Sequence, residues 1–279
     1  MKNKQILTIL LFILFASCRD KTPVVIAEQD PFKVFPAHFT QKVLLENFVS
    51  ESNIESVENS FFIKELEKKY GDRLIVANMH KQDWLETPFT NDLATELGGM
   101  SSYPRAAINR RPGINTVQNE DNYTLLKPIN WDYTIANAFL QEAKVSLAVE
   151  TDISYPNKGR VKLHIAHKDA LANDMRVGLY MVEDNVQSIF QQGSNDNFMH
   201  HNVMKNALLE IGGESVDLGT ENIDGEIITR EYNDLDLKFY HIENLYLVAF
   251  VFNYDKDFRK MKIYNAVKVK FGGVKFWNE

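Results

Sequence analysis

The stretch 43–80 constrains the fold of this chain more than any other. It begins with a short apolar run at 43–45 and continues into a polar loop at 50–53. A helical pattern follows, which ends at Tyr70, and Gly71 stands where a helix C-cap is expected. A second apolar run covers 74–79. Strand, helix and strand at these lengths predict a βαβ unit, and such crossovers build a parallel sheet.

The residues of this stretch resemble the opening of a thioredoxin-type domain, in the form found in the outer membrane protein 28 family of bacterial lipoproteins. The resemblance rests on the strand VLLENF at 43–48 and on a charged helix that ends in Tyr-Gly-Asp at 70–72. Later blocks at 182–184, 200–203 and 265–266 are similar to the C-terminal half of the same family. The resemblance therefore covers most of the chain, from about residue 42 to residue 271.

A C-x-x-C motif often stands in the loop of this family, and its two cysteine positions fall here at Asn53 and Ser56. Thiol–disulfide exchange needs one thiolate to attack and a second thiol to resolve the mixed disulfide. The single cysteine of the chain is Cys18. We therefore expect a thioredoxin-like domain without dithiol oxidoreductase activity.

The first 18 residues have the pattern of a lipoprotein signal peptide. Lys2 and Lys4 precede an apolar run at 6–15, and a small-residue cleavage site leads to Cys18. The run is too short to span a bilayer of roughly 30 Å as a helix. We expect cleavage after residue 17 and lipid on the Cys18 thiol; an ordinary signal peptide or an uncleaved anchor is the alternative.

Loss of residues 1–17 removes two lysines and changes the net charge from −7 to −9. An acidic protein is a poor candidate for binding nucleic acid or anionic membrane by charge. We expect the lipid on Cys18 to hold the protein at the outer membrane, with either face open as its location. Residues 18–37, which prolines interrupt, are expected to form a tether.

The thioredoxin-like domain is expected to cover 38–143. Thr87 and Pro88 have the pattern of an N-cap and a first helical residue, and a further helix is expected at 131–143. By resemblance, Tyr103-Pro104 matches the cis-proline that faces the redox loop in thioredoxin-like folds. The backbone beside Pro104 is either a binding edge for an extended peptide or a structural remnant.

From Lys144 the apolar pattern changes from helical to alternating. Strands are expected at 145–150, 160–165, 175–180, 223–230, 235–240, 245–252 and 263–271, with turn residues between them. This pattern predicts an antiparallel β-sandwich domain at 144–279. The expected fold class is thus α/β plus all-β, a thioredoxin-like domain followed by a sandwich.

No catalytic constellation stands out in the sequence. There is no G-x-S-x-G motif and no glycine-rich phosphate loop. His164 and His167 point to opposite faces of a strand, and His200 and His201 diverge likewise if extended. We therefore expect no catalytic, cofactor-binding or metal-binding residues and no cofactor.

These observations favour a non-enzymatic outer-membrane lipoprotein that binds a protein or another ligand, as an accessory component of a larger outer-membrane complex. The rival hypothesis is a peptide-binding chaperone or enzyme-like envelope protein that uses the groove beside Pro104 without thiols. Direct binding of sugar or peptide by the sandwich is a third possibility.

Overall fold

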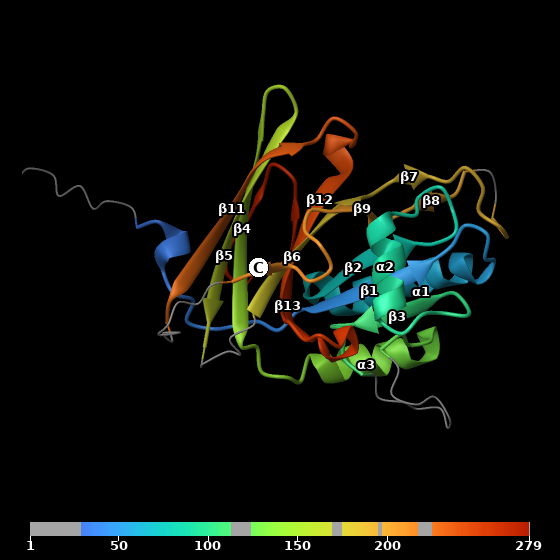
Figure 1. Ribbon diagram of the computed structural model, residues 1–279, viewed down its shortest axis with the longest axis horizontal. Helices are drawn as coiled ribbons and strands as arrows, with labels where there is room; N and C mark the ends of the chain where they lie inside the picture. Colours follow the sequence, from blue (N-terminus) through green and yellow to red (C-terminus); the bar gives the residue numbers. More distant parts are fainter. Residues whose placement is uncertain (1–28, 113–123, 169–174, 195–196, 217–224, 279) are drawn as a thin grey trace, which may run out of the picture. The chain divides into compact units, whose positions relative to one another are not determined.

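The computed structural model describes residues 29–112, 124–168, 175–194, 197–216 and 225–278. The segment Pro31–Glu279 forms one compact unit. The described part is mostly β-structure with few helices, and it contains one mixed sheet and one antiparallel sheet (Figure 1).

The larger sheet has eight strands within the described residues, and it runs in the order β13-β12-β6-β9-β2-β1-β3, with β10 pairing to β6. Strands β1 and β2 are parallel, β2 and β9 are parallel, and the other pairs are antiparallel. The strands are β1 (Val43–Val49), β2 (Leu74–His80), β3 (Arg105–Ile108), β6 (Met175–Glu183), β9 (Val203–Ala207), β10 (Glu214–Ser215), β12 (Leu245–Asn253) and β13 (Ile263–Lys270).

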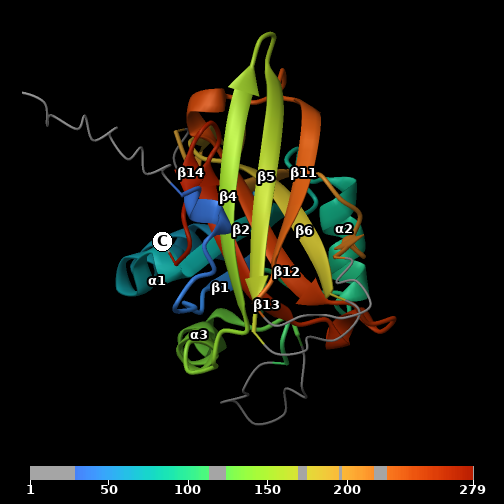
Figure 2. The same cartoon turned by 90° about the vertical axis from the view of Figure 1, so that its left-hand side faces the viewer.

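The smaller sheet runs in the order β11-β5-β4-β14 and is antiparallel throughout. Figure 2 looks onto β4, β5 and β11, which lie in front of the larger sheet. A short pair, β7 and β8, stands apart from both sheets. The bounds are β4 (Val145–Ser154), β5 (Lys158–His167), β7 (Val186–Gln187), β8 (Met199–His200), β11 (Ile227–Asp236) and β14 (Val274–Lys275).

Three α-helices gather at the β1–β3 end of the larger sheet (Figure 1): α1 (Glu55–Tyr70), α2 (Pro88–Glu96) and α3 (Trp131–Ala138). Gly71 ends α1 with a positive φ of 57°, as the sequence predicted. Thr87 Oγ1 accepts a hydrogen bond from the Thr90 N–H at 3.1 Å, so Thr87 is the N-cap of α2 and Pro88 its first residue. Short 3₁₀ turns lie at Pro31–Lys33, Gly71–Arg73, Pro128–Asn130, Ile242–Asn244 and Phe258–Lys260.

The alternation of side chains along the strands assigns each face of the larger sheet to a core. In β1, Leu44 and Phe48 pack with α2, whereas Val43 and Leu45 pack with α1 and α3. In β12 the same alternation sends one face to the α2 core and the other to the smaller sheet. One face of the larger sheet is thus covered by α2, and the other face by the smaller sheet at one end and by α1 and α3 at the other.

The boundary predicted at Lys144 does not divide this unit. The larger sheet joins strands from 38–143 and from 144–279, because β2 pairs with β9 at Asn78↔Val203 and β9 pairs with β6. The α2 core likewise contains residues of both parts, such as Phe48 and Phe250. The two expected domains share one sheet and one core. The sequence pattern could not predict this, because local periodicity does not show which distant strands pair.

Three smaller expectations also need correction or lie outside the described residues. The strand expected at 235–240 is wrong, because β11 passes through a bulge between Tyr232 and Leu235 and ends at Asp236. The helix expected at 131–143 ends earlier, at Ala138. The first two residues of the strand expected at 223–230 fall outside the described residues.

Candidate functional site

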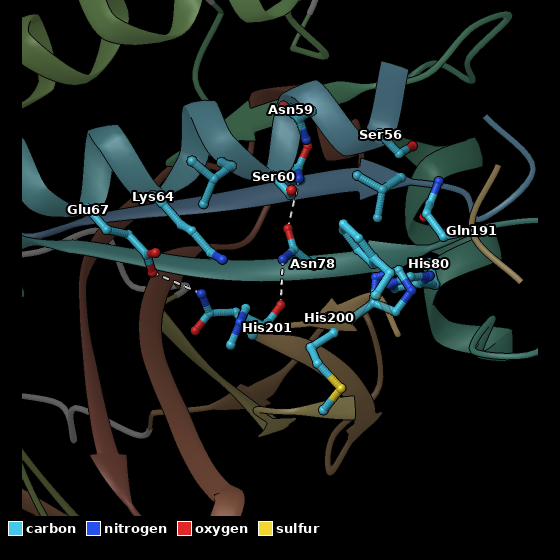
Figure 3. A pocket seen from close by; sticks show the side chains of 16 residues that line it. Ser56, Asn59, Ser60, Lys64, Glu67, Asn78, His80, Gln191, His200 and His201 are labelled. Carbon is cyan, nitrogen blue, oxygen red and sulfur yellow. Dashed lines mark hydrogen bonds between the residues drawn. The ribbon is translucent and has the colours of Figure 1, made fainter. Parts of the chain in front are cut away.

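A pocket lies beneath α1, at the carboxyl ends of the parallel strands β1 and β2. Its floor comes from β1 and β2, one wall from α1, and the other wall from the chain around β8 (Figure 3). In α/β sheets ligands bind in the crevice outside the carboxyl ends of parallel strands. The cavity volume of the pocket is about 40 Å³.

The floor is polar because the residues of both strands that face α1 change from apolar to polar towards the carboxyl ends of the strands. In β1 the residues that face α1 are Val43 and Leu45 and then Asn47, and in β2 they are apolar up to Val76 and then Asn78. Asn47 donates through Nδ2 to Asn78 Oδ1 at 2.7 Å. Every second residue of each strand faces α1, and these residues change from apolar to polar along the strand. The change is visible in the sequence, but the expectations above missed it.

The second wall comes from the C-terminal half of the chain. Asn78 donates from Nδ2 to the His201 carbonyl at 2.6 Å and from its backbone N–H to the Asn202 carbonyl at 2.7 Å. Gln191 Nε2 donates to the carbonyls of Glu51 and Asn53, at 3.3 and 3.1 Å. The chain from Gln191 to β8 therefore packs against the β1–α1 loop.

A buried network of acids and imidazoles lies behind the pocket. Glu51 Oε1 accepts hydrogen bonds from Ser188 Oγ at 2.5 Å and from His200 Nε2 at 3.0 Å. His80 Nδ1 lies 2.9 Å from Asp83 Oδ2, and the two imidazole rings meet edge to face with centroids 4.7 Å apart. Glu51, His80 and Asp83 belong to the N-terminal half of the chain, and Ser188 and His200 to the C-terminal half. The network therefore joins both halves.

Burial lowers the pKa of His200 to about 4, and the nearby His80 imidazole acts in the same direction against the opposing effect of Glu51. Burial acts to raise the pKa of the Asp83 carboxyl, but the interactions with His80 and with the N–H groups of Glu51 and Leu85 together lower it. His200 is therefore neutral at pH 7, and Asp83 is ionised.

The pocket contains polar atoms that have no hydrogen-bond partner among the described residues. They are Asn47 Oδ1, both amide atoms of Asn59, His80 Nε2 and Gln191 Oε1. All four side chains are more than nine-tenths buried. Buried polar groups are nearly always paired, and those that are not call for an explanation.

Asn53 and Ser56, the two positions of the missing cysteines, have structural contacts of their own. Asn53 Oδ1 accepts the Glu55 N–H at 2.8 Å at the start of α1. Ser56 Oγ accepts the Ser50 N–H at 3.3 Å, and Ser56 also lines the pocket. The structure brings Ser56 into the site and leaves Asn53 at its edge.

The peptide bond between Tyr103 and Pro104 is cis, at the position that the sequence predicted. Pro104 is buried, and it directly precedes β3, which pairs with β1 at Phe48↔Arg105. Neither Tyr103 nor Pro104 lines the pocket.

The remaining expectations concern the membrane and metals. Cys18 and the signal peptide lie outside the described residues. No helix among the described residues is long and apolar enough to cross a membrane. The described residues also contain no group of three or more His, Cys, Asp or Glu side chains placed to hold a metal ion.

A family model described as "Outer membrane protein Omp28" matches residues 93–274, which is more than half of the chain. The chain belongs to the Omp28 family. The resemblance stated from the sequence is thereby confirmed, and this Omp28 protein is a protein of the outer membrane. No curated protein sequence matches it significantly.

Two solved structures are similar to this Omp28 protein. HBP35 of Porphyromonas gingivalis has 18% sequence identity and a TM-score of 0.69, over 85% of this chain and 77% of that chain. A domain of the outer membrane lipoprotein Omp28 from Porphyromonas gingivalis also has 18% identity, with a TM-score of 0.30 over 47% of this chain and 89% of that chain. The first likeness indicates a shared fold across most of the described residues.

Proposed function

We propose that this Omp28 protein is a non-enzymatic binding component of the outer membrane, held there by lipid on Cys18. Its binding site is the pocket between α1 and β8. The observation that carries the proposal is the set of buried polar atoms without partners among the described residues, all of them in side chains that line one pocket. Such groups destabilise the folded state unless a ligand or water pairs with them.

We assign a thioredoxin-like fold to the N-terminal part of the unit. Its parallel β1–α1–β2 unit, the antiparallel β3 beside β1 and the proline before β3 all support this assignment. The packing of the smaller sheet against β6, β12 and β13 likewise supports a β-sandwich in the C-terminal part. Gln191 and His200 contact the β1–α1 loop, which is where the family carries its C-x-x-C motif.

The non-enzymatic part of the proposal rests on the contacts of the former cysteine positions. Asn53 and Ser56 are engaged with backbone N–H groups, and the chain has no thiol apart from Cys18. Insulin reduction by the purified protein is expected to be nil, and measurable reduction would contradict this part of the proposal. The rival chaperone hypothesis would use a separate hollow beside Pro104, which Ser101 and Arg105 line.

Site-specific photo-crosslinking tests the binding site. A photoreactive residue at Met199, which is 38% exposed and lines the pocket, is expected to form a defined adduct in intact outer membranes. The matched position is Ile129, which is 71% exposed and does not line the pocket. The adduct at 199 should disappear in the pocket-filling variant Asn59→Leu. Equal adducts from both positions, or an adduct that survives Asn59→Leu, would exclude the pocket as the binding site.

A further inference from the structure

The unpaired atoms of the pocket have a composition that points to the chemistry of its ligand. Three of them are amide oxygens, which accept hydrogen bonds, and one is the amide nitrogen of Asn59, which donates. The fifth, His80 Nε2, accepts when the ring is neutral, because His80 Nδ1 donates to the ionised Asp83 carboxylate. A ligand that pairs with all of them must offer both donors and acceptors in a small space.

We propose that this pocket binds the hydroxyl edge of a neutral sugar; the inference rests on the proposed binding function. A hydroxyl donates one hydrogen bond and accepts others, so two adjacent hydroxyls can pair with both amide atoms of Asn59. The room of about 40 Å³ admits roughly three water-sized groups. This is the size of two or three hydroxyls of one sugar ring.

The charges around the pocket favour a neutral ligand. The atoms without partners among the described residues belong to uncharged amides and to one imidazole. Of the carboxylates nearby, Glu67 accepts from Asn202 Nδ2 at 2.8 Å, and Glu51 is bound by Ser188 and His200. Lys64 is exposed at the mouth, where water solvates its charge. On entering the floor, a charged ligand would therefore lose its hydration against unpaired atoms of the described residues that carry no opposite charge.

The mouth of the pocket supplies an apolar surface for the rest of the sugar ring. Phe198 and Met199 line it, and the Phe198 ring packs edge to face on His200 with centroids 4.9 Å apart. A sugar ring has C–H groups on its faces, so one face can pack on these side chains while its hydroxyl edge enters the polar floor. A few placed polar groups beside an aromatic wall are typical of small-ligand sites.

Binding of sugars to the full-length lipoprotein, purified in a detergent without a sugar headgroup, tests the proposal. The probes are glucose, galactose, mannose and N-acetylglucosamine, with galacturonate as a charged control, and the measurement is saturation-transfer NMR. At least one neutral sugar is expected to bind, with its hydroxyl-edge protons receiving the most saturation. Binding of galacturonate but of no neutral sugar, or of none of the probes, would overturn the inference.

The variant Asn59→Ala separates a ligand contact from a structural contact. It removes two buried polar atoms without partners among the described residues and places a better helix former in α1. We expect sugar binding to weaken at least tenfold while the midpoint of thermal unfolding rises. The control Asn91→Ala, on the exposed surface of α2, should leave binding unchanged.

Unchanged binding in Asn59→Ala would overturn the sugar site, and so would a lower unfolding midpoint, since that would make Asn59 a structural residue. The two proposals fail separately. If the adduct at Met199 forms and depends on an open pocket but no neutral sugar binds, the binding function stands and the sugar inference is wrong.

Discussion

At the scale of single residues, Glu46 and Arg110 form an ion pair that is almost completely buried. Arg110 is 1% exposed and Glu46 0%. The Arg110 guanidinium donates to Glu46 Oε1 at 2.8 Å and to Glu46 Oε2 at 2.9 Å, and Tyr180 Oη donates to Glu46 Oε1 at 2.6 Å. Burial opposes the charge of Arg110, but Glu46 outweighs it and raises the pKa of Arg110.

Removal of one member of this pair is expected to destabilise the fold strongly. Glu46→Gln leaves the Arg110 charge buried without its counter-charge, which costs about 3–5 kcal/mol. Tyr180→Phe retains the ion pair and loses only hydrogen bonds, so its cost should be about 2 kcal/mol. Urea unfolding measures both values. A loss smaller for Glu46→Gln than for Tyr180→Phe would show that the pair contributes no more than its neutral hydrogen bonds.

His200 should make the stability of the protein depend on pH. In the unfolded chain a histidine takes up a proton near pH 6.5, whereas folded His200 does so only near pH 4. The contribution of neutral His200 to the free energy of unfolding is therefore complete above pH 6.5. It is lost as the pH falls towards 4, and the total loss is about 3 kcal/mol. The charged or titratable groups that face it are Glu51, His80 and Asp83.

Unfolding by urea between pH 7 and pH 4 tests this dependence. His200→Gln retains an amide N–H for Glu51 and removes the titrating group. The free energy of unfolding of this variant should fall less steeply between pH 6.5 and pH 4 than that of the wild type. Equal slopes would mean that other groups cause the acid destabilisation.

At the scale of elements, Asn265 joins β13 to β4 and to the chain before β1. Its Nδ2 donates to the carbonyls of Val145 at 2.7 Å and Thr40 at 2.9 Å. Its Oδ1 accepts the N–H groups of Lys42 and Ala266, each at 3.0 Å. One buried amide thus satisfies backbone groups of three segments, which gives a physical reason for the block at 265–266 that carried part of the family resemblance.

Asn265→Ala removes these four hydrogen bonds, and the backbone groups that made them stay buried without this partner. We expect a loss of about 2–4 kcal/mol of unfolding free energy. Asn233→Ala, an exposed asparagine in β11, is the matched control and should change stability by no more than about 0.5 kcal/mol. Chemical unfolding of both variants provides the measurement, and equal effects would mean that the Asn265 contacts contribute little.

The sequence predicted those elements whose signals are local. The cap at Thr87, the end of α1 at Gly71 and the alternation of β5 and β12 each depend on neighbours along the chain, and the structure has them. It did not predict β9, which is short and mixed in polarity. The pocket was missed for a related reason. Its walls meet through contacts between distant segments, such as the pairing of β2 with β9, although the change to Asn47 and Asn78 was visible in the sequence.

At the scale of the whole molecule, the shared sheet makes the two halves of the compact unit interdependent. If residues 144–279 stood alone, β9 would lose its partner β2, and Tyr180, Val248 and Phe250 would lose the β1, β2 and α2 side chains that complete their core. Exposed strand edges and apolar surface of this kind favour aggregation. We therefore expect residues 144–279 expressed alone to be unstable or insoluble.

The same continuity predicts that residues 31–279 unfold in one cooperative transition. Hydrogen exchange in urea should show β1, β2, β4 and β5 losing protection together, even though β4 and β5 lie in the smaller sheet. The variant Glu46→Gln provides the sharper test, because it perturbs β1 directly and touches neither β4 nor β5. In a cooperative unit it lowers the unfolding midpoint of all four strands equally. If the unfolding midpoint fell only for β1 and β2, the two halves would be separate folding units, with a boundary near Lys144.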